Sequence, residues 1–498
     1  MAKEESNDKK DNDEEKTPPT PEDRLSVTQH HVTIDGKTIN YTVTTGTIVL
    51  KEEAEKDGKS EGEKAKASIF FIAYTLNDVD DVTKRPLTFS FNGGPGSSSV
   101  WLHLGALGPR RIKTDEKGNL LQPPYSLIDN EYSILDHTDL VFIDPVSTGF
   151  SRAVSGEKPK QFHGFKKDIE SVGDFIRLYI TRYHRWTSPK FLIGESYGTT
   201  RAGGLSGYLQ ERHGMYLNGI MLISVVLNFQ NILFHPGNDL PYILFLPTYT
   251  ATAWYHKRLD DGLQADLRQT LDEVEAFAMG EYTLALMKGS ALSEEERANI
   301  VKKLARYTGL SPDYIQRTDL RINIGRFCKE LLREEGRTVG RFDSRFTGID
   351  RDSAGESFEY DPSYAVIQGP YTASFNDYVR RELEFESDLP YEILTGHVRP
   401  WSYEDFQNAY VNVADTLRKA MTVNPHLKVF VANGYYDLAT PYMTTQYTFN
   451  HLGLDKSLQD NISMEYYEAG HMMYVHLPSL AQLKADLGSF IQLTIPAA

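Results

Sequence analysis

A serine lies at the centre of a short glycine-flanked motif, Gly194-Glu195-Ser196-Tyr197-Gly198. The motif follows the apolar segment 191–193, which is typical of a buried strand, and precedes a segment with helical character. A glycine on each side permits the sharp strand-to-helix turn that exposes a nucleophilic hydroxyl. The motif alone also arises by coincidence, and its position directly after a strand is what favours a nucleophile. We therefore predict that Ser196 is a catalytic nucleophile.

A serine nucleophile requires a histidine base and a carboxylate that orients the histidine. In folds with this kind of turn, the chain order is serine, then acid, then histidine. Asp437 follows one strand-like segment near the C-terminus, and His471 follows the next. Because α/β sheets place their chemistry at the carboxyl ends of the strands, we expect both side chains to meet Ser196 there.

The sequence offers one competitor for each partner. His476 is a second candidate base, although its position nearer the last helix of the chain makes it the weaker one. Asp144 follows another strand-like segment and is a second candidate acid, but it precedes the serine, against the expected order. We therefore predict that Asp437 and His471 complete the triad.

Backbone N–H groups are also needed, because the tetrahedral intermediate of acyl transfer carries a negative oxygen. The segment Asn92-Gly93-Gly94-Pro95-Gly96 directly follows the apolar run 87–91. Its two adjacent glycines let backbone N–H groups approach a substrate oxygen. A second donor is expected from the N–H of Tyr197, the residue after the nucleophile. The alternative is a Gly/Pro turn without catalytic function.

Short apolar runs of the kind found in buried parallel strands recur along the chain. They lie at 87–91, 140–143, 191–193, 219–226, 428–431 and 463–467. Residues 166–183 between two of them carry apolar side chains at helical spacing. This alternation of strands and helices indicates an α/β fold with a mostly parallel central sheet.

Between about 240 and 400 the pattern becomes mainly helical, and Ser293-x-x-Glu296 is a capping box. We predict an inserted helical cap that packs over the strand ends and forms a wall of the site. Its aromatic residues either line a peptide groove or fill the core of the cap, and we expect the core for at least half of them. They are Tyr242, Phe245, Tyr249, Trp254 and Tyr255.

The predicted organisation has four parts: a disordered acidic leader (1–24), the first part of the core (25–239), the helical cap (240–400) and the second part of the core (401–498). Within the first part, Asp35-Gly36 signals a β-hairpin. Residues 51–66 are so rich in charge that we expect an exposed loop there.

Composition excludes several classes of protein. The 498 residues include 53 basic and 69 acidic ones, a net charge of −16, which argues against nucleic-acid or anionic-membrane partners. There is no run of about 18 apolar residues, so we expect no membrane span, and no signal peptide is recognisable. Cys328 is the only cysteine, which excludes an internal disulfide and a cysteine-based structural zinc site.

Several separated motifs together resemble the serine carboxypeptidase family. Besides the motif around Ser196, they are Asn92-Gly93-Gly94-Pro95-Gly96-Ser97-Ser98-Ser99, Asp144-Pro145-Val146-Ser147-Thr148-Gly149-Phe150-Ser151 and Gly470-His471-Met472. They span roughly residues 67 to 490 in the family's order, with the helical insertion only weakly matched. The resemblance implies an α/β-hydrolase core with a cap over the active site. It also implies removal of C-terminal residues from peptides, without any cofactor.

The resemblance further implies a role for individual residues. The implied nucleophile, orienting acid and base are Ser196, Asp437 and His471. The implied oxyanion hole is the backbone of Gly94 and Tyr197. The residues implied to hold the terminal carboxylate of the peptide are Asn92 and Glu195.

Three positions depart from the family pattern. Where the family has a second acid that pairs with the glutamate, this chain has Ala106. The family's tryptophan two residues before the asparagine is Ser90, and its cysteine after Gly-Pro-Gly is Ser97. These departures suggest a bacterial branch of the family. They leave the nucleophilic residues intact and affect how a terminal carboxylate is recognised.

The loss of the second acid leads to an expectation about pH. A lone Glu195 beside a substrate carboxylate must be protonated, because two like charges repel. His471 must be neutral to act as a base. We therefore predict a bell-shaped profile of kcat/KM, with a maximum on the acid side of neutral but closer to neutrality than in relatives with the acid pair.

The leading hypothesis is a serine carboxypeptidase that acts on peptides through an acyl-enzyme on Ser196. An esterase or acyltransferase with the same triad is the main alternative. A hydroxynitrile lyase is more remote. A binding or scaffolding protein on an inactive hydrolase fold is opposed by the complete set of Ser196, Asp437, His471 and Gly94. The resemblance favours an extracytoplasmic location, periplasmic or secreted. Neither the oligomeric state nor the preferred side chains follow from the sequence.

Overall fold

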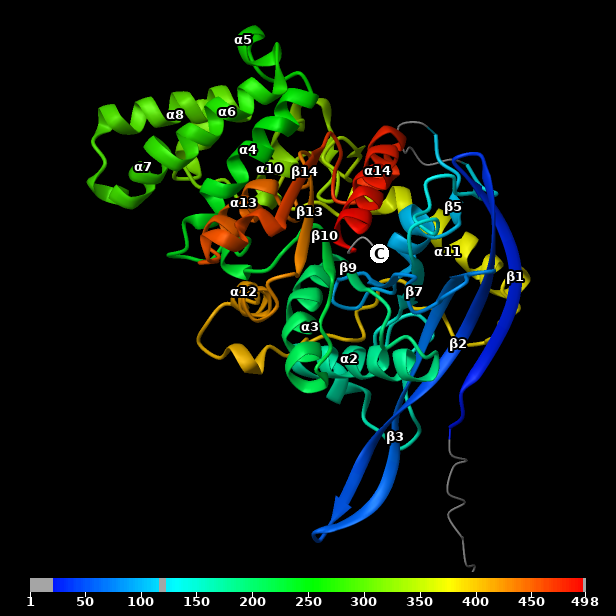
Figure 1. Cartoon of the computed structure of the whole chain (residues 1–498). Coiled ribbons are helices and arrows are strands. Elements are labelled where there is room, and N and C mark those ends of the chain that lie inside the picture. The colour runs from blue at the N-terminus through cyan, green and yellow to red at the C-terminus, as the bar shows by residue number, and fades with distance from the viewer. Residues whose placement is uncertain (1–20, 116–121, 496–498) are drawn as a thin grey trace, which may run out of the picture.

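Six parallel strands form the centre of the main sheet. The computed structural model describes residues 21–115 and 122–495, and within these ranges the main sheet has ten strands (Figure 1). The parallel strands are, in spatial order, β7 (Asp139–Ile143), β4 (Leu87–Phe91), β9 (Lys190–Ser196), β10 (Gly219–Val225), β13 (Lys428–Gly434) and β14 (Ile462–Tyr467). Every residue of β4, β7 and β10 is buried, as expected for parallel strands that are covered on both faces. The predicted mostly parallel sheet is confirmed.

Antiparallel strands extend this sheet beyond β7. They are β1 (Arg24–Ile34), β2 (Lys37–Lys56), β3 (Lys59–Leu76) and the short β8 (Arg152–Ala153). The predicted hairpin turn at Asp35-Gly36 is confirmed, with positive φ at both residues. The chain then reverses again at Asp57-Gly58, also with positive φ at both.

The expectation of a loop over residues 51–66 was wrong. Lys51 pairs with Ala65 and Lys56 with Lys59, so this segment is the outer part of a long β-ribbon (Figure 1). Most side chains of the ribbon's outer part are exposed, so its strands carry charged residues on both faces. Without one buried face, the sequence lacks the apolar alternation by which a strand is recognised.

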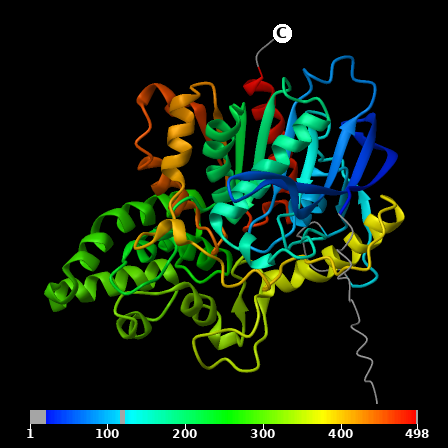
Figure 2. The same cartoon turned by 90° about the horizontal axis from the view of Figure 1, so that it is seen from below.

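Helices cover both faces of the sheet (Figures 1 and 2). One face carries α2 (Phe165–Arg182), α3 (Tyr197–His213) and α12 (Ala414–Val423), and the other carries α1 (Val100–Leu102), α11 (Pro362–Arg381) and α14 (Leu477–Thr494). Consecutive strand residues supply the two cores in turn: Leu192 packs into one and Ile193 into the other.

A group of helices between β10 and β13 has a hydrophobic core of its own. The helices are α4 (Leu240–Tyr255), α5 (Asp261–Gln264), α6 (Leu267–Phe277), α7 (Thr283–Lys288), α8 (Glu294–Thr308), α9 (Pro312–Arg317) and α10 (Ile324–Glu330). The predicted capping box is present at the start of α8, where Ser293 and Glu296 bond each other's backbone N–H. Phe245 and Tyr249 are buried in this core, and Tyr242 and Trp254 pack against it. At least half of the five aromatics therefore contribute to the core as expected, whereas Tyr255 is exposed.

Residues 338–402 pack differently from the helices before them. After the two-stranded pair β11 (Thr338–Val339) and β12 (Thr347–Gly348), helix α11 packs into the core of the main sheet. Beyond α11, backbone hydrogen bonds join Ser98 N to Ile393 O (3.1 Å) and Thr395 N to Gly96 O (2.9 Å). The range 240–400 therefore contains two packing groups, and its limits as a domain stay a prediction.

Shorter elements complete the described chain. They are β5 (Arg110–Ile112) and β6 (Leu127–Asp129), α13 (Tyr442–Asn450), the π-helical turns η1 (His103–Leu107) and η4 (Ala278–Tyr282), and the 3₁₀ turns η2 (Pro159–Phe162), η3 (Phe229–Asn231), η5 (Gly289–Ala291), η6 (Arg333–Glu335), η7 (Glu404–Phe406), η8 (Lys456–Asn461) and η9 (Met473–Val475). The predicted leader, 1–24, falls almost wholly outside the described residues. None of the helices described here has the length and apolar character needed to cross a membrane.

Candidate active site

Ser196 is the last residue of β9 and directly precedes α3. Its backbone has φ 60° and ψ −130°, a conformation that L-residues rarely adopt. The turn is so tight that a Cβ atom on Gly194 would lie 2.2 Å from the carbonyl oxygen of Gly198. This is the strained strand-to-helix turn that presents a serine hydroxyl, as the sequence predicted.

His471 and Asp437 are brought together from two neighbouring loops, after β14 and β13. The Nδ1 atom of His471 lies 2.7 Å from Oδ2 of Asp437, and both side chains are buried. The hydroxyl of Thr440 also donates to Oδ2 (2.7 Å), and the N–H groups of Ala439 and Thr440 donate to Oδ1. Asp437 is thus held in one orientation by four donors, and it orients the imidazole.

The electrostatics of this pair favour opposite charges. Burial alone would raise the pKa of Asp437, but His471 and the hydroxyl and N–H donors outweigh burial and lower it. Burial alone would lower the pKa of His471, but the Asp437 carboxylate outweighs burial and raises it. The imidazole is therefore a stronger base than a free histidine, as a general base for serine needs to be.

A short segment of the insertion, residues 340–346, holds both of these loops. The hydrogen bonds that fasten it include those from His471 N to Phe342 O (2.6 Å), from Leu438 N to Arg341 O (3.1 Å) and from Gly470 N to Asp343 Oδ2 (3.2 Å). The ring of Phe342 also lies against the imidazole, with centroids 5.1 Å apart. The acid and the base are thus positioned in part from outside the sheet, while Ser224 of β10 also donates to His471 O (2.6 Å).

The loop after β4 lies directly against the serine turn. A Cβ atom on Gly93 would lie 2.4 Å from the backbone N of Tyr197, so only glycine fits at this position. Gly94, with φ 103°, and Tyr197 line the same cavity as Ser196. The structure thus brings together the two residues that were expected to form the oxyanion hole.

A buried arginine on α3 forms a hydrogen bond with the backbone of that loop. The Arg201 guanidinium donates to the carbonyl oxygen of Asn92 (2.6 Å) and to both carboxylate oxygens of Asp168 (2.8 and 3.1 Å). Arg201 and Asp168 are both almost completely buried. The Arg201 guanidinium therefore joins α3 to the loop through the Asn92 carbonyl and to α2 through the buried ion pair with Asp168.

Asn92 and Glu195 also meet, and a tyrosine joins them. The Asn92 amide donates to Oε1 of Glu195 (2.9 Å), and the hydroxyl of Tyr474 donates to Oε2 (2.6 Å). Burial raises the pKa of the Glu195 carboxyl to about 7. This carboxyl group therefore changes its protonation state near neutral pH.

Tyr474 packs on the turn that carries Ala106, the position where the family pattern has a second acid. A Cβ atom on Gly105 would lie 2.4 Å from Cε2 of Tyr474, so the tyrosine ring packs directly on Gly105, beside Ala106. Ala106 is buried in the π-helical turn η1. The absence of a side chain at Gly105 leaves room for Tyr474, which supplies Glu195 with a neutral partner.

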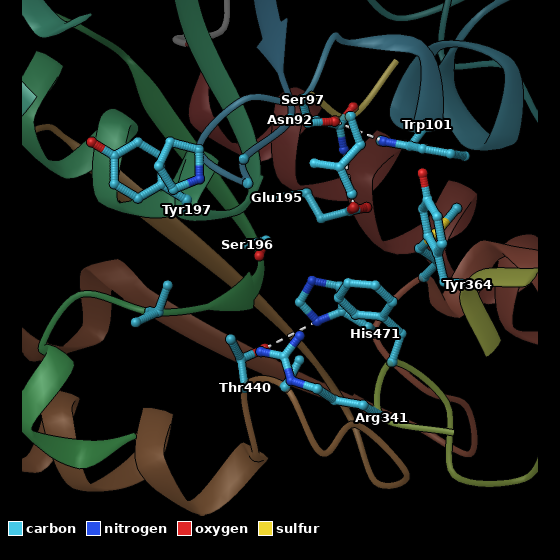
Figure 3. Close-up of a pocket in the computed structure, with 18 of the residues that line it drawn as sticks. Asn92, Ser97, Trp101, Glu195, Ser196, Tyr197, Arg341, Tyr364, Thr440 and His471 are labelled. Atoms are coloured by element: carbon cyan, nitrogen blue, oxygen red, sulfur yellow. Dashed lines mark hydrogen bonds between the residues drawn. The ribbon is translucent and has the colours of Figure 1, made fainter. Parts of the chain in front are cut away.

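Ser196, His471 and Glu195 face one cavity of about 440 Å³ (Figure 3). Its walls come from the serine turn, from the loop after β4, from residues 341–342 and from residues 394–403. The insertion thus forms part of the wall, as expected. The aromatic lining residues of the described chain are Trp101, Tyr197, Phe229, Phe342, Tyr364 and Tyr403, and none of the five aromatics singled out in α4 is among them.

The two competing residues lie elsewhere. Asp144 is buried and accepts hydrogen bonds from the backbone N–H and hydroxyl of Ser99, both at 2.8 Å. His476 contacts the hydroxyl of Ser479 (2.9 Å) at the start of α14. Neither lines the cavity. Asp437 and His471 are therefore the pair that the structure places at Ser196.

Sequence reasoning missed three residues of this site: Tyr474, Arg201 and Arg341. Tyr474 and Arg201 contact site residues that are more than 100 positions away in the sequence, and Arg341 belongs to the insertion. Arg201 lies on the helix after the nucleophile. An arginine on the buried side of a predicted helix indicates that an acidic residue is buried next to it. No comparable signal marks Tyr474 or Arg341.

Comparisons with known proteins agree with this geometry. Residues 58–480 match the model of the family described as serine carboxypeptidase. The pheromone-processing carboxypeptidase KEX1 of Saccharomyces cerevisiae is 34% identical over 160 residues, covering 30% of this chain and 20% of the yeast protein. Serine carboxypeptidase-like 36 of Arabidopsis thaliana is 29% identical over 167 residues, covering 32% of this chain and 33% of the plant protein. The matched stretches thus span a third or less of these relatives.

One solved structure extends the likeness to almost the whole chain. The crystal structure of Kex1(delta)p, a prohormone-processing carboxypeptidase from Saccharomyces cerevisiae, superimposes with a TM-score of 0.55 and covers 91% of each chain. The sequence identity over this match is 17%, so it shows the fold. The predicted α/β-hydrolase architecture is confirmed, whereas the predicted bacterial origin stays a prediction.

Proposed function

The chain belongs to the serine carboxypeptidase family, and we propose that it removes C-terminal residues from peptides through an acyl-enzyme on Ser196. One observation carries the proposal. A buried glutamic acid, held by Asn92 and Tyr474, immediately precedes the nucleophile in the same cavity. Hydrolysis of an internal bond or an ester does not need a carboxyl group there, whereas recognition of a free peptide end does.

The proposed reaction begins with attack of the Ser196 oxygen on the last peptide carbonyl carbon. His471 Nε2 accepts the hydroxyl proton, and Asp437 stabilises the resulting imidazolium through Nδ1. The N–H groups of Gly94 and Tyr197 stabilise the oxyanion. The C–N bond then breaks, and His471 returns the proton to the departing amino group. Water hydrolyses the acyl-enzyme by the same sequence of proton transfers.

The proposed recognition of the terminal carboxylate uses Glu195 as a hydrogen-bond donor. With a pKa of about 7, Glu195 is protonated in a substantial fraction of molecules at neutral pH. A protonated carboxyl group donates to the substrate carboxylate without like-charge repulsion. Tyr474 donates a hydrogen bond to Oε2 of Glu195 and carries no charge. A single acid, Glu195, can therefore bind the terminal carboxylate without a second acid as its partner.

Digestion of a peptide of defined sequence, followed by mass spectrometry, tests the proposal. We expect stepwise loss of residues from the C-terminus, and no product from the same peptide with an amidated C-terminus. Ser196→Ala is the matched control and should give no products. Internal cleavage, or equal cleavage of the amide, would contradict the proposal.

An esterase or acyltransferase is the second candidate, because the triad and the oxyanion hole serve those reactions equally well. Matched ester and peptide substrates with the same acyl group separate the two activities. Activity on the ester alone would favour this alternative. An extracytoplasmic site of action is a further proposal, supported by family resemblance alone, and cell fractionation tests it.

A further inference from the structure

Two arginines line the substrate cavity, Arg341 and Arg399. Among the residues that the structure describes, neither guanidinium forms an ion pair or a hydrogen bond with an acidic side chain. Within the described ranges, Glu195 is the only acidic residue in the lining, and its raised pKa leaves it partly neutral. The cavity therefore carries unpaired positive charge within a chain whose net charge is −16.

Arg341 is the better positioned of the two. Its carbonyl oxygen accepts from Leu438 N (3.1 Å), and its own backbone N donates to Asp361 Oδ1 (3.0 Å), so its backbone is held on both sides. Its guanidinium carbon lies 5.3 Å from the ring centre of Phe342, whose ring packs on His471. The charge is therefore fixed close to the catalytic base. Arg399 is exposed at the rim.

This charge lies apart from the residues assigned to the peptide end. In the view of Figure 3, Glu195 lies above the ring of His471 and Arg341 lies below it. Arg341 is only partly buried, so it keeps a face toward the cavity. A guanidinium group binds carboxylates through two parallel N–H donors.

We propose that Arg341 is a specificity-determining residue that binds an acidic side chain of the substrate next to the bond that is cleaved. The inference rests on the proposed function, since it names the class of peptide that the same site prefers. The preferred substrates have Asp or Glu as the released or the penultimate residue. Arg399 adds a weaker attraction at the rim.

Matched pairs of N-blocked dipeptides test this inference. One pair differs only by Glu or Gln as the released residue, and a second pair by Glu or Gln as the penultimate residue. Hydrogen bonds to a charged group discriminate by about 10- to 100-fold, so we expect kcat/KM for the Glu peptide to exceed that for the Gln peptide by this factor in one pair. Because both peptides meet the same preparation, the ratio does not depend on the fraction of folded enzyme.

Arg341→Gln should bring this ratio close to 1, and Arg341→Lys should keep part of it. Arg399→Gln should lower it by a smaller factor. Arg381→Gln is the matched control, because Arg381 is exposed on α11 and pairs with Asp377 (2.7 Å). The control should show the wild-type ratio.

Two results would overturn the inference. The first is a wild-type ratio of 1 or less in both pairs. The second is an unchanged ratio in Arg341→Gln, and if kcat/KM there falls equally on Glu and Gln peptides, Arg341 binds a part of the peptide that both share, such as its end. Cleavage of the Gln peptides by the wild type shows that the proposed function holds in each case. Failure to cleave any dipeptide would instead contradict the proposed function.

Discussion

The two halves of the active site are held in place by different parts of the molecule. The serine turn and the loop after β4 are fixed by the interior of the sheet, through the close contact of Gly93 with Tyr197 and the buried pair of Arg201 with Asp168. The loops of Asp437 and His471 are fixed by residues 340–346 of the insertion.

Because of this difference, we expect mutations in the first half to affect mainly stability and mutations in the second half to affect mainly catalysis. The first half shares its contacts with the core, so its loss should appear mainly as a loss of folding free energy. The second half is held by one hydrogen bond from Ser224 of β10 and, in addition, by several hydrogen bonds to a segment outside the sheet. A change there should displace the base by a small distance, to which catalysis is far more sensitive than stability.

The largest effect is expected at the triad itself, where both halves meet. Ser196→Ala and His471→Ala should each lower kcat by about 10⁶, because the members of a triad act as one unit. Asp437→Asn should lower kcat by about 10⁴, because the amide favours the wrong tautomer of His471. Steady-state kinetics on a peptide substrate measure these losses.

The double variant of Ser196 and His471 gives the control for cooperation. Its loss should equal that of either single variant. Losses that multiply, or near-wild-type rates in Ser196→Ala, would contradict the assignment.

Arg201→Met tests the half that depends on the core. Removal of the guanidinium leaves Asp168 as an uncompensated buried charge, which should lower the free energy of unfolding by about 3–5 kcal/mol. Denaturant titration measures the loss. Arg201→Met/Asp168→Leu should recover part of it, because no buried charge then remains.

The exposed pair of Arg381 and Asp377 is the matched control, and Arg381→Met should cost less than about 1 kcal/mol. A large fall in kcat for Arg201→Met without any loss of stability would show that the two halves do not differ in the way described.

Asp343→Ala tests the half that depends on the insertion. It removes the acceptor of Gly470 N, next to His471, and the partner of Arg345. We expect kcat to fall by about 10- to 100-fold, since a displacement of about 1 Å has effects of this size. Asp343→Asn retains an acceptor oxygen and should lose less. If kcat falls only in proportion to the folded fraction, measured by circular dichroism, the segment does not position the base.

The smallest effect concerns pH. Below its raised pKa, His471 is protonated and inactive as a base, which gives the acid limb of kcat/KM. Above about pH 7, Glu195 loses its proton and repels the terminal carboxylate, which gives the alkaline limb. We therefore expect a narrow maximum close to neutral pH, with about a tenfold fall per pH unit beyond the alkaline limb.

Glu195→Gln separates the two limbs. The amide keeps a donor and does not titrate, so the alkaline limb should disappear while the acid limb remains. An ester substrate without a free carboxylate should show the same profile in the wild type. An alkaline limb that persists in Glu195→Gln would assign it to another group.

The sequence was informative where chemistry depends on short motifs at strand ends. The turn around Ser196, the order of Asp437 and His471, and the glycines after β4 are local patterns with strong steric requirements. Even the meeting of Asn92 with Glu195 followed from the family resemblance. The structure brings these motifs together because each lies at the carboxyl end of a parallel strand, and these ends meet at one edge of the sheet.

Contacts between distant segments could not be predicted from the sequence, for a physical reason. Tyr474 reaches Glu195 across 279 positions, and a tyrosine near the last helix is as typical of a core as of a site. The β2–β3 ribbon was not recognised in the sequence for a different reason. Its turn residues Asp57-Gly58 were visible, but its two solvated faces gave no apolar period to support a strand.

The junction between Gly96–Ser98 and residues 393–395 has a practical consequence. It is built from backbone hydrogen bonds at a place where the family pattern has a cysteine, and Ser97 accepts from Trp101 Nε1 (2.7 Å) instead. Assembly of the active site therefore requires no oxidant, and the enzyme should be produced and assayed unchanged under strongly reducing conditions.

The one native thiol, Cys328, is fully buried in the insertion and resists modification. The variant His397→Cys would thus carry one exposed thiol, which would react selectively with a fluorophore and report on substrate entry at the cavity rim.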